Sequence, residues 1–316
     1  MNILKIFKKK RSITLKTKKY GLVYHIPIAA RAYNNKNVFY FSITSMIKDE
    51  GMYLEEWIEF HRMVGCEHFI LYDNDSTDDT VEILQKYIKS NIVTLIPWPR
   101  FCTTYSLHML AYSHALNLMA GRTRWLCFID LDEFLFPTET DDLRTALVEF
   151  ENEPAVGVYW SLFGTSDHKS KPQGLVTENY TWRMPYPMER NAVPNYEHLH
   201  KKIGGIQFKS IVQPARVIST IDPHAFRTDQ FPVLAVDGGW NEIRTHKQRF
   251  FIGKFQLNHY ISKSQEEWNI RIERGALIGV DKSKRKNRLL DAIEADPIKD
   301  TEILKYLPKL KCKVSV

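Results

Sequence analysis

Four short apolar runs alternate with three amphipathic stretches between residues 38 and 129, and this alternation constrains the fold more than any other feature. The runs are VFYFSITSMI (38–47), HFILY (68–72), IVTLIPW (92–98) and WLCFI (125–129), whose β-branched and aromatic residues favour strands. The stretches at 51–65, 76–90 and 106–121 carry apolar residues at helical spacing. Strands that alternate with helices predict an α/β fold with a mostly parallel central sheet and helices on both faces.

Composition limits the class of protein. The 316 residues are 44% hydrophobic, which is enough to bury one large core or two modest ones. The net charge of +7 favours acidic partners, such as a nucleotide diphosphate or an anionic membrane surface. We expect no nucleic-acid partner, because the basic residues concentrate at the two ends and no helix-turn-helix, zinc or RNP pattern lies between them.

Cysteine usage and hydropathy indicate where the chain works. The four cysteines form no Cys-x-x-Cys pair, which predicts reduced thiols and neither a zinc site nor a disulfide framework: Cys66, Cys102, Cys127 and Cys312. No run reaches the roughly 18 apolar residues of a membrane span, and the first residues lack a secretory signal pattern. We therefore expect a cytoplasmic protein.

Both ends of the chain are basic. The first twenty residues hold eight Lys and Arg, no acid and four clustered apolar residues. This composition fits a peripheral contact with the inner face of the cell membrane, and it fits a disordered solubilising tail equally well. We predict a basic N-terminal segment (1–36), two halves of the body (37–145 and 146–275) and a basic C-terminal tail (276–316). That tail is either a second basic contact or a solvated helical cap.

Acidic segments follow three of the four predicted strands. They are KDE (48–50), DNDSTDD (73–79) and DLDE (130–133). Parallel sheets bind ligands beyond the carboxyl ends of their strands, so the coincidence predicts a ligand site at this edge. Each cluster alone also fits turn chemistry, and Ser76 and Asp79 are spaced as a capping box before the second helix.

Asp130 and Asp132 form an Asp-x-Asp pair directly after the most apolar run. Carboxylate oxygens are preferred ligands of Mg²⁺ and Mn²⁺, which also bind substrate phosphates. An isolated Asp-x-Asp pair is a weak signal, but its apolar lead-in places it on a rigid strand end. The pair therefore predicts a divalent cation site.

Several separated blocks resemble the family 92 glycosyltransferases and their bacterial relatives, which are similar to the family 2 enzymes with a GT-A fold. The blocks include SMIKDEGMYLEEWIEFHRMVGCEHFILYDNDSTDDT, WLCFIDLDEFLFP, FKSIVQPARV and NHYISKSQEEWNIRIERG, and they cover residues 38–275 in order. The resemblance implies a GT-A-like α/β sheet and an inverting transferase that uses a nucleotide sugar. It implies that residues 37–145 are the nucleotide-sugar-binding half and that residues 146–275 are the acceptor-binding and catalytic half, an acceptor-side extension of the sheet. It also implies that Asp130 and Asp132 bind the metal and the donor diphosphate.

The resemblance assigns further donor residues. The two loops after the first strands would line the nucleoside pocket, with Lys48, Glu50, Asp73 and Asp75 as the contacting residues. By analogy with GT-A enzymes, His259 would be a further metal ligand. Its alternative is a histidine satisfied within the core.

The sequence offers more than one candidate for the cation that contacts the diphosphate and for the catalytic base. Lys209 and Lys263 are candidates for the diphosphate contact, and either also fits an ordinary surface cation. An inverting transfer needs a carboxylate to deprotonate the acceptor hydroxyl. The candidates are Asp167, Glu189 and Asp237, each of which also fits an exposed turn acid.

The resulting hypothesis is a metal-dependent hexosyltransferase of cell-surface glycan biosynthesis. It would use a UDP-sugar and Mn²⁺ or Mg²⁺, and extend a carbohydrate or glycolipid, such as lipopolysaccharide or capsule. Aromatic residues that could stack on sugar rings support such an acceptor, although they also fit a core: Trp160, Trp182, Tyr186, Tyr196 and Trp240. The rival classes are a glycoside hydrolase that uses paired carboxylates and a basic nucleic-acid-binding protein.

Overall fold

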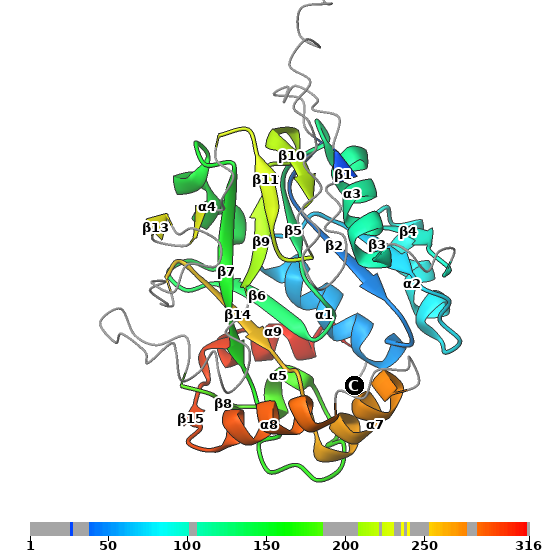
Figure 1. Ribbon diagram of the computed structural model, residues 1–316, viewed down its shortest axis with the longest axis vertical. Helices are drawn as coiled ribbons and strands as arrows, with labels where there is room; N and C mark the ends of the chain where they lie inside the picture. Colours follow the sequence, from blue (N-terminus) through cyan, green and yellow to red (C-terminus); the bar gives the residue numbers. More distant parts are fainter. Residues whose placement is uncertain are drawn as a thin grey trace, which may run out of the picture.

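The computed structural model describes residues 26–27, 38–100, 106–185, 208–220, 223–230, 235–236, 239–240, 253–276 and 283–314. Figure 1 shows a central sheet with helices packed around it. In chain order its elements are β1 (Ile26–Pro27), β2 (Phe39–Ile47), α1 (Gly51–Met63), β3 (His68–Asp73), α2 (Thr80–Lys89), β4 (Val93–Pro97), α3 (Leu107–Met119), β5 (Thr123–Phe128), β6 (Glu133–Pro137), α4 (Leu143–Leu147), the 3-10 helix η2 (Val148–Phe150) and β7 (Ala155–Leu162).

The second half of the chain adds shorter strands and a group of C-terminal helices. They are α5 (Val176–Asn179), β8 (Trp182–Arg183), β9 (Phe208–Val212), the 3-10 helix η3 (Pro214–Arg216), β10 (Val217–Thr220), β11 (Phe226–Thr228), β12 (Ala235–Val236), β13 (Gly239–Trp240), β14 (Phe255–His259), α7 (Gln265–Ala276), α8 (Ser283–Glu294), β15 (Ile298–Lys299), the 3-10 helix η4 (Glu302–Tyr306) and α9 (Leu307–Lys311).

The main sheet confirms the predicted α/β fold. Its strand order is β13-β12-β7-β9-β5-β2-β3-β4, with β14 joined to β7. The four predicted strands, now β2, β3, β4 and β5, pair in parallel with one another. Strand β9 pairs antiparallel with both β5 and β7, so the two predicted halves of the chain share one continuous sheet.

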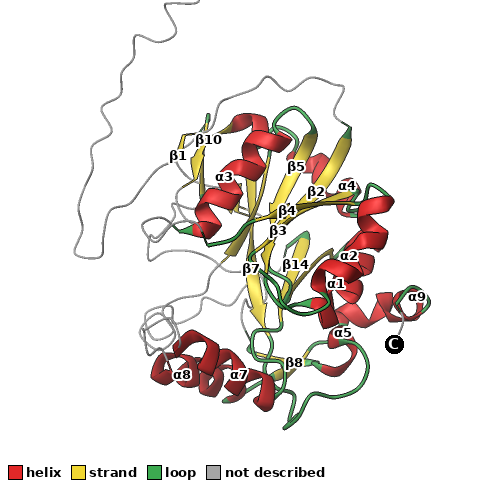
Figure 2. Ribbon diagram, turned by 90° about the vertical axis from the view of Figure 1, so that its right-hand side faces the viewer, coloured by secondary structure: helices red, strands yellow, loops and turns green. Residues whose placement is uncertain are grey.

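Helices cover both faces of this sheet, as the alternating pattern predicts. Figure 2 shows α1 and α2 on one side and α3 on the other. Within β3, Phe69 packs against Trp57 of α1, whereas its neighbour Ile70 packs in the cluster that contains Tyr112 of α3. Successive strand residues point to opposite faces, and each fully buried side chain of this size stabilises the fold by about 2 kcal/mol.

The strand order fixes where a ligand can bind. The chain runs from β2 through β3 to β4 on one side, and then returns to place β5 on the other side of β2. Strands β2 and β5 are parallel neighbours, so their carboxyl ends meet at one edge of the sheet, where such sheets bind ligands in a crevice. Residues 48–50 leave β2 and residues 129–132 leave β5, so both acidic segments border this crevice.

A smaller arrangement of strands brings a distant histidine to the same place. Strand β14 pairs antiparallel with β6, where His259 lies opposite Glu133. The same strand pairs in parallel with β7, where His259 lies opposite Leu162. The turn between β5 and β6 contains Asp130 and Asp132, so β14 delivers His259 next to them.

The predicted C-terminal tail is corrected over residues 283–314, which pack against the body of the protein. Ile293, Ile303 and Leu310 are fully or almost fully buried, and the Tyr306 ring lies 5.5 Å from that of Phe60 in α1. The basic residues of this segment alternate with apolar residues that face inward. The segment is therefore amphipathic, and its net charge alone does not indicate that it packs against the core.

A buried ion pair supports the same C-terminal segment. The Arg183 guanidinium in β8 donates from Nε to Asp300 Oδ2 at 2.6 Å, directly after β15. The side chains are 8% and 5% exposed. Burial of both groups makes the pair costly to break from one side, since a lone buried charge would remain.

The predicted capping box at the second helix is wrong. The residue before α2, Asp79, makes no capping hydrogen bond with its side chain. The Ser76 hydroxyl instead accepts a hydrogen bond from the Asp49 amide at 3.0 Å, and Asp78 Oδ1 accepts one from the Thr80 amide at 3.1 Å. The spacing of Ser76 and Asp79 fits a capping box, but the Ser76 hydroxyl is hydrogen-bonded to the loop after β2 instead.

Other predictions concern the ends of the chain and the thiols. No helix in the described part of the chain combines the length and apolar character that a membrane span requires. The first twenty residues, for which a membrane contact is predicted, fall outside the described residues. Cys66, Cys127 and Cys312 are free thiols, and Cys102 lies outside the described residues.

Candidate functional site

The loops that follow β2 and β3 are joined by hydrogen bonds. Lys48 Nζ donates to the carbonyl oxygens of Asn74 and Asp75, both at 2.9 Å. Asp49 Oδ1 accepts from the Thr77 amide at 2.7 Å. Asp49 and Asp75 both have positive φ, of 51° and 57°, a conformation that aspartate tolerates better than most residues. The two acidic segments thus form one structural unit beside the crevice.

Asp130 is held by a buried cation. Lys209 Nζ, on β9, donates to Asp130 Oδ2 at 2.7 Å and lies 3.5 Å from Glu133 Oε1. The Lys209 side chain is 2% exposed and Glu133 is fully buried, whereas Asp130 is 36% exposed. The predicted contact of Lys209 with a diphosphate is therefore corrected: its ammonium faces two carboxylates from beneath the cavity and positions Asp130.

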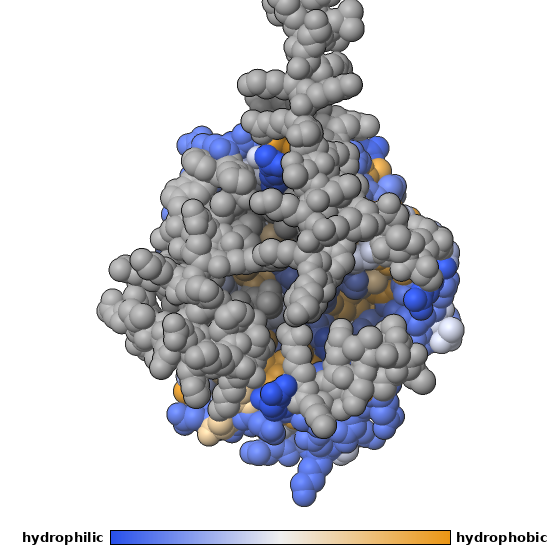
Figure 3. Space-filling model, in the orientation of Figure 1, coloured by the Kyte–Doolittle hydropathy of each residue, from blue (hydrophilic) through white to orange (hydrophobic). Residues whose placement is uncertain are grey.

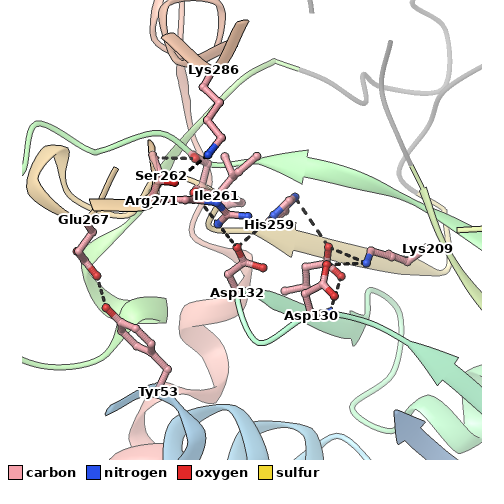
Figure 4. A network of polar contacts seen from close by, with 12 residues as sticks. Tyr53, Asp130, Asp132, Lys209, His259, Ile261, Ser262, Glu267, Arg271 and Lys286 are labelled. Atoms are coloured by element: carbon pink, nitrogen blue, oxygen red, sulfur yellow. Dashed lines mark hydrogen bonds and ion pairs between the residues drawn. The ribbon is translucent and has the colours of Figure 1, made fainter. Parts of the chain in front are cut away.

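Asp132 faces a histidine and an arginine. His259 Nε2 lies 3.4 Å from Asp132 Oδ2, and Arg271 Nη1 of α7 donates to the same oxygen atom. Figure 4 shows the two side chains converging on Asp132 while Lys209 contacts Asp130. Neighbouring aspartates in one turn therefore have different partners, and only Asp132 is close to His259.

Protonation in this cluster follows from burial and charge. Burial would raise the pKa of Asp132, but the Arg271 guanidinium and the His259 ring hold that pKa well below its usual range. Burial raises the pKa of Glu133 well above its usual range, although the Lys209 ammonium opposes this shift. Burial also lowers the pKa of His259, which leaves its ring neutral at pH 7.

The donor atoms of this cluster suit a divalent cation. One ligand atom from each of Asp132, Glu133 and His259 lies within 4.8 Å of the others. In the described part of the chain, both ring nitrogens of His259 and Oε1 of Glu133 are buried and make no hydrogen bond. Nδ1 of His259 lies 3.9 Å from Glu133 Oε1, and Nε2 of the same ring lies 3.4 Å from Asp132 Oδ2. Buried polar atoms normally have partners, so a ring without a hydrogen bond between two carboxyl groups suits a bound cation. Neutral imidazole with carboxylate oxygens is a donor set that Mn²⁺ accepts.

A cavity of about 530 Å³ opens in front of the cluster. Glu50 borders it from the loop after β2, Tyr53 from α1 and His108 from α3. Lys263 and Arg271 border it from the segment after β14. Asp130 and Asp132 also line it. Its volume falls in the range that encloses small-molecule ligands.

The predicted site residues are therefore partly brought together. The structure gathers Glu50, Asp130, Asp132, Lys263 and, behind them, His259. Lys48 is exposed and supports the second loop. Asp73 accepts from the Ser76 amide at 3.2 Å and Asp75 is exposed at the loop tip, and neither lines the cavity.

The three candidate bases lie apart from this cavity or outside the described residues. Asp167 is exposed in a turn after β7, with φ of 66°, and does not line the cavity. Glu189 and Asp237 fall outside the described residues.

Comparison with known proteins identifies the family. The model of glycosyltransferase family 92 matches residues 38–281, most of the chain. The chain belongs to glycosyltransferase family 92. A glycosyltransferase family 92 protein of Ricinus communis is 29% identical over 243 residues, which cover 72% of this chain and 40% of that protein.

Other relatives of this family 92 chain are more distant. The galactan beta-1,4-galactosyltransferase GALS2 of Arabidopsis thaliana is 27% identical over 104 residues, or 31% of this chain and 20% of that protein. This chain spans less than half the length of these plant relatives. Lipopolysaccharide and capsule, the predicted products, appear in none of these names.

Solved structures with some likeness to the family 92 chain share little sequence with it. S. aureus TarS 1-349 in complex with UDP-GlcNAc has a TM-score of 0.36 and 13% identity, covering 80% of this chain and 70% of that one. Glucosyl-3-phosphoglycerate synthase from Mycobacterium tuberculosis, in complex with Mn²⁺ and UDP, has a TM-score of 0.29 and 13% identity, covering 60% and 65%. Both likenesses are too low to carry a statement about binding.

Sequence reasoning missed two residues of the candidate site. Glu133 was noticed beside the Asp-x-Asp pair but received no role, because its pairing with β14 was not visible in the sequence. Arg271 had no signal of its own, since an arginine on a polar helix usually faces solvent. The helical spacing of Trp268 and Arg271 shows in retrospect that Arg271 lies near the buried face of α7.

Proposed function

We propose that this chain transfers a sugar from a UDP-sugar to a carbohydrate or glycolipid acceptor, with the help of a divalent cation. Family 92 membership supports the reaction class. The observation that carries the site is the buried group of Asp132, Glu133 and His259, in which neither ring nitrogen of His259 makes a hydrogen bond to any described residue, behind a cavity that Asp132 lines.

In this proposal Asp132, His259 and Glu133 hold Mn²⁺ or Mg²⁺. When bound, such a cation stabilises the negative charge that develops on a departing nucleoside diphosphate. Asp130 is fixed by Lys209 and faces the cavity, so it is placed to accept hydrogen bonds from the ribose. The buried Lys209 is a positioning residue, and the predicted direct role of Asp130 as a metal ligand gives way to Glu133.

The remaining donor groups lie around the cavity. Lys263 is placed to meet the diphosphate, as its Nζ lies 4.2 Å above the Tyr53 ring in the cavity wall. Glu50 borders the same cavity, and Lys48 ties the loop that holds Asp73 and Asp75 to the segment before Glu50. Inversion at the donor carbon remains a proposal, with Asp167, Glu189 and Asp237 as candidate bases.

The rival hydrolase needs a protonated carboxylic acid that reaches a glycosidic oxygen. Glu133 has a suitably raised pKa, but it is fully buried and does not line the cavity. It therefore cannot reach a sugar without rearrangement. This favours the transferase over the hydrolase.

A donor screen tests the proposed function. Transfer and slow donor hydrolysis are measured with UDP-galactose, UDP-glucose, UDP-N-acetylhexosamines and GDP-mannose, with Mn²⁺ or with EDTA. We expect one UDP-sugar to be consumed with Mn²⁺ and its consumption to fall about a hundredfold or more with EDTA, because the diphosphate charge is then uncompensated. Consumption that is unaffected by EDTA contradicts the cation, and consumption of GDP-mannose alone contradicts the uridine nucleotide.

Replacing Lys48 by methionine should weaken UDP binding about fivefold in the presence of Mn²⁺. Without Lys48 the loop after β3 is less ordered before UDP binds, and the free energy of ordering it is subtracted from the free energy of binding. Lys48 is itself exposed and joins the two loops through backbone carbonyls. Calorimetric titration with UDP measures the change. The matched control is Lys86→Met, which removes an exposed cation paired with Glu55 on α2. Equal affinities in wild type and Lys48→Met would show that the loop contact does not serve the nucleotide.

A further inference from the structure

We propose that Arg271 occupies, in the cation-free protein, the place on Asp132 that a divalent cation takes, and that cation binding releases Arg271 toward the phosphate groups of the donor. This inference rests on the proposed function, since it requires that the cavity receives both a cation and a nucleotide diphosphate. Arg271 thereby becomes a positioning residue that couples the two ligands.

The first argument is a shared atom. Arg271 Nη1 donates to Asp132 Oδ2 and to the Ile261 carbonyl oxygen, the latter at 3.0 Å. The same Oδ2 lies 3.4 Å from His259 Nε2. A cation bound between Asp132 and His259 would therefore meet the guanidinium at one oxygen atom. A cation and a guanidinium that share one oxygen atom repel strongly where water is partly excluded. We therefore expect the cation and Arg271 to compete for Asp132.

The second argument is the path into the site. Asp132 and Arg271 line the cavity, whereas His259 does not and is 3% exposed. The Arg271 side chain is 43% exposed. A cation that enters from the cavity thus reaches Asp132 and Arg271 before it reaches His259. Arg271 lies at the entrance, and its exposure leaves it room to turn away.

The third argument is that helix α7 is anchored without the Arg271 side chain. Trp268 is 1% exposed, and Glu267 accepts hydrogen bonds from the Tyr53 and Tyr180 hydroxyl groups. Lys286 of α8 donates to the backbone carbonyl oxygen of Arg271 at 2.8 Å, not to its side chain. Figure 2 shows α7 and α8 lying together below the sheet. At the bottom of the molecule in Figure 3, the surface of the described residues is mostly hydrophilic. The guanidinium can therefore move while the helix stays.

The fourth argument concerns where the released side chain would go. Lys263 lines the same cavity as Arg271. A guanidinium matches two phosphate oxygens at once, which an ammonium does not. With a cation on Asp132, a nucleotide diphosphate in the cavity offers Arg271 a new negative partner. The Arg271 side chain would contact Asp132 before the cation and the nucleotide bind, and the phosphate groups afterwards.

Calorimetric titration and the electron paramagnetic resonance signal of free Mn²⁺ test this inference without measuring turnover. In Arg271→Met, Mn²⁺ without nucleotide should bind about tenfold more tightly than in wild type, because Asp132 loses its competing charge. With saturating Mn²⁺, UDP should bind the same variant about tenfold more weakly, because a phosphate partner is lost. Arg271→Lys retains the charge and should keep Mn²⁺ affinity closer to that of wild type.

The matched control is Lys171→Met, which removes a cation from the same cavity wall without a contact to Asp132. Its Mn²⁺ affinity should change by less than about twofold. Equal tightening in Lys171→Met and Arg271→Met would overturn the inference, since a general charge effect would explain both. Should Arg271→Met fail to fold, judged by circular dichroism, Arg271→Gln carries the same expectations.

The outcomes separate this inference from the proposed function. If wild type binds Mn²⁺ and UDP but Arg271→Met binds Mn²⁺ no more tightly, the competition is overturned and the transferase proposal stands. If wild type fails to bind Mn²⁺ alone while Arg271→Met binds it, the competition is supported. If neither protein binds Mn²⁺ or UDP, both proposals are overturned.

Discussion

Asparagine in place of Asp132 is expected to lower the rate of sugar transfer about a thousandfold, with the fold intact. The substitution keeps the size of the side chain but removes the negative charge beside His259 and Arg271. Without that charge the cation binds poorly, and the charge on the leaving diphosphate is stabilised less. Initial rates with the preferred UDP-sugar at several Mn²⁺ concentrations measure the effect.

The control for this prediction is Asp141→Asn, which makes the same chemical change at an exposed residue paired loosely with Lys305 at 3.8 Å. Its rate should match wild type. Circular dichroism establishes that both variants are folded. A rate for Asp132→Asn within about threefold of wild type at saturating Mn²⁺ would contradict the assignment of Asp132 to the cation, since loss of such a charge normally costs far more.

Methionine in place of Lys209 is expected to lower the free energy of unfolding by about 3 kcal/mol at pH 7, because the Asp130 carboxylate loses its buried counter-charge. Burial alone would lower the pKa of Lys209, but Asp130 and Glu133 raise it, so the ammonium is charged in the folded protein. Urea unfolding followed by circular dichroism measures the loss. Lys305→Met is the control, because its exposed ion pair contributes at most about 1 kcal/mol.

The effect of Lys209→Met should depend on pH. Burial would raise the pKa of Asp130, but in wild type the Lys209 ammonium keeps it lowered, so Asp130 contributes stability above its unfolded pKa that is lost as pH falls through the folded one. Without Lys209 the folded pKa of Asp130 rises, and the charged form becomes destabilising. The difference from wild type should therefore be largest at neutral pH and shrink on acidification toward pH 4. A difference that is constant over this range would indicate lost packing as the cause.

The parallel part of the sheet, β2 to β5, could be predicted from the sequence because local patterns determine it. The runs that became β2 to β5 are apolar and short, and the helices between them carry one or two apolar faces, so periodicity alone identifies both. The parallel pairing then follows from the helical crossovers. The acidic segments after these strands converge on one crevice for the same reason.

The chemistry within the site could not be predicted in the same way. The roles of Asp130 and Glu133 depend on Lys209 and His259, which follow them by roughly a hundred residues and reach them only through sheet pairing. Lys209 is a cation in an otherwise buried strand, and its spacing does not reveal whether it faces a ligand or a carboxylate. A residue's partners across a sheet are set by register, which a single sequence does not show.

The C-terminal segment has a consequence for how this protein can be divided. The family match ends at residue 281, yet Ile303, Tyr306 and Leu310 close the apolar face of α1 beyond it. Cutting the chain at the family boundary would leave that face open to water, and would remove Asp300 from the buried Arg183. The part of this chain that matches the family is thus shorter than the part that packs as one body, so a domain boundary placed at residue 281 would cut through the core.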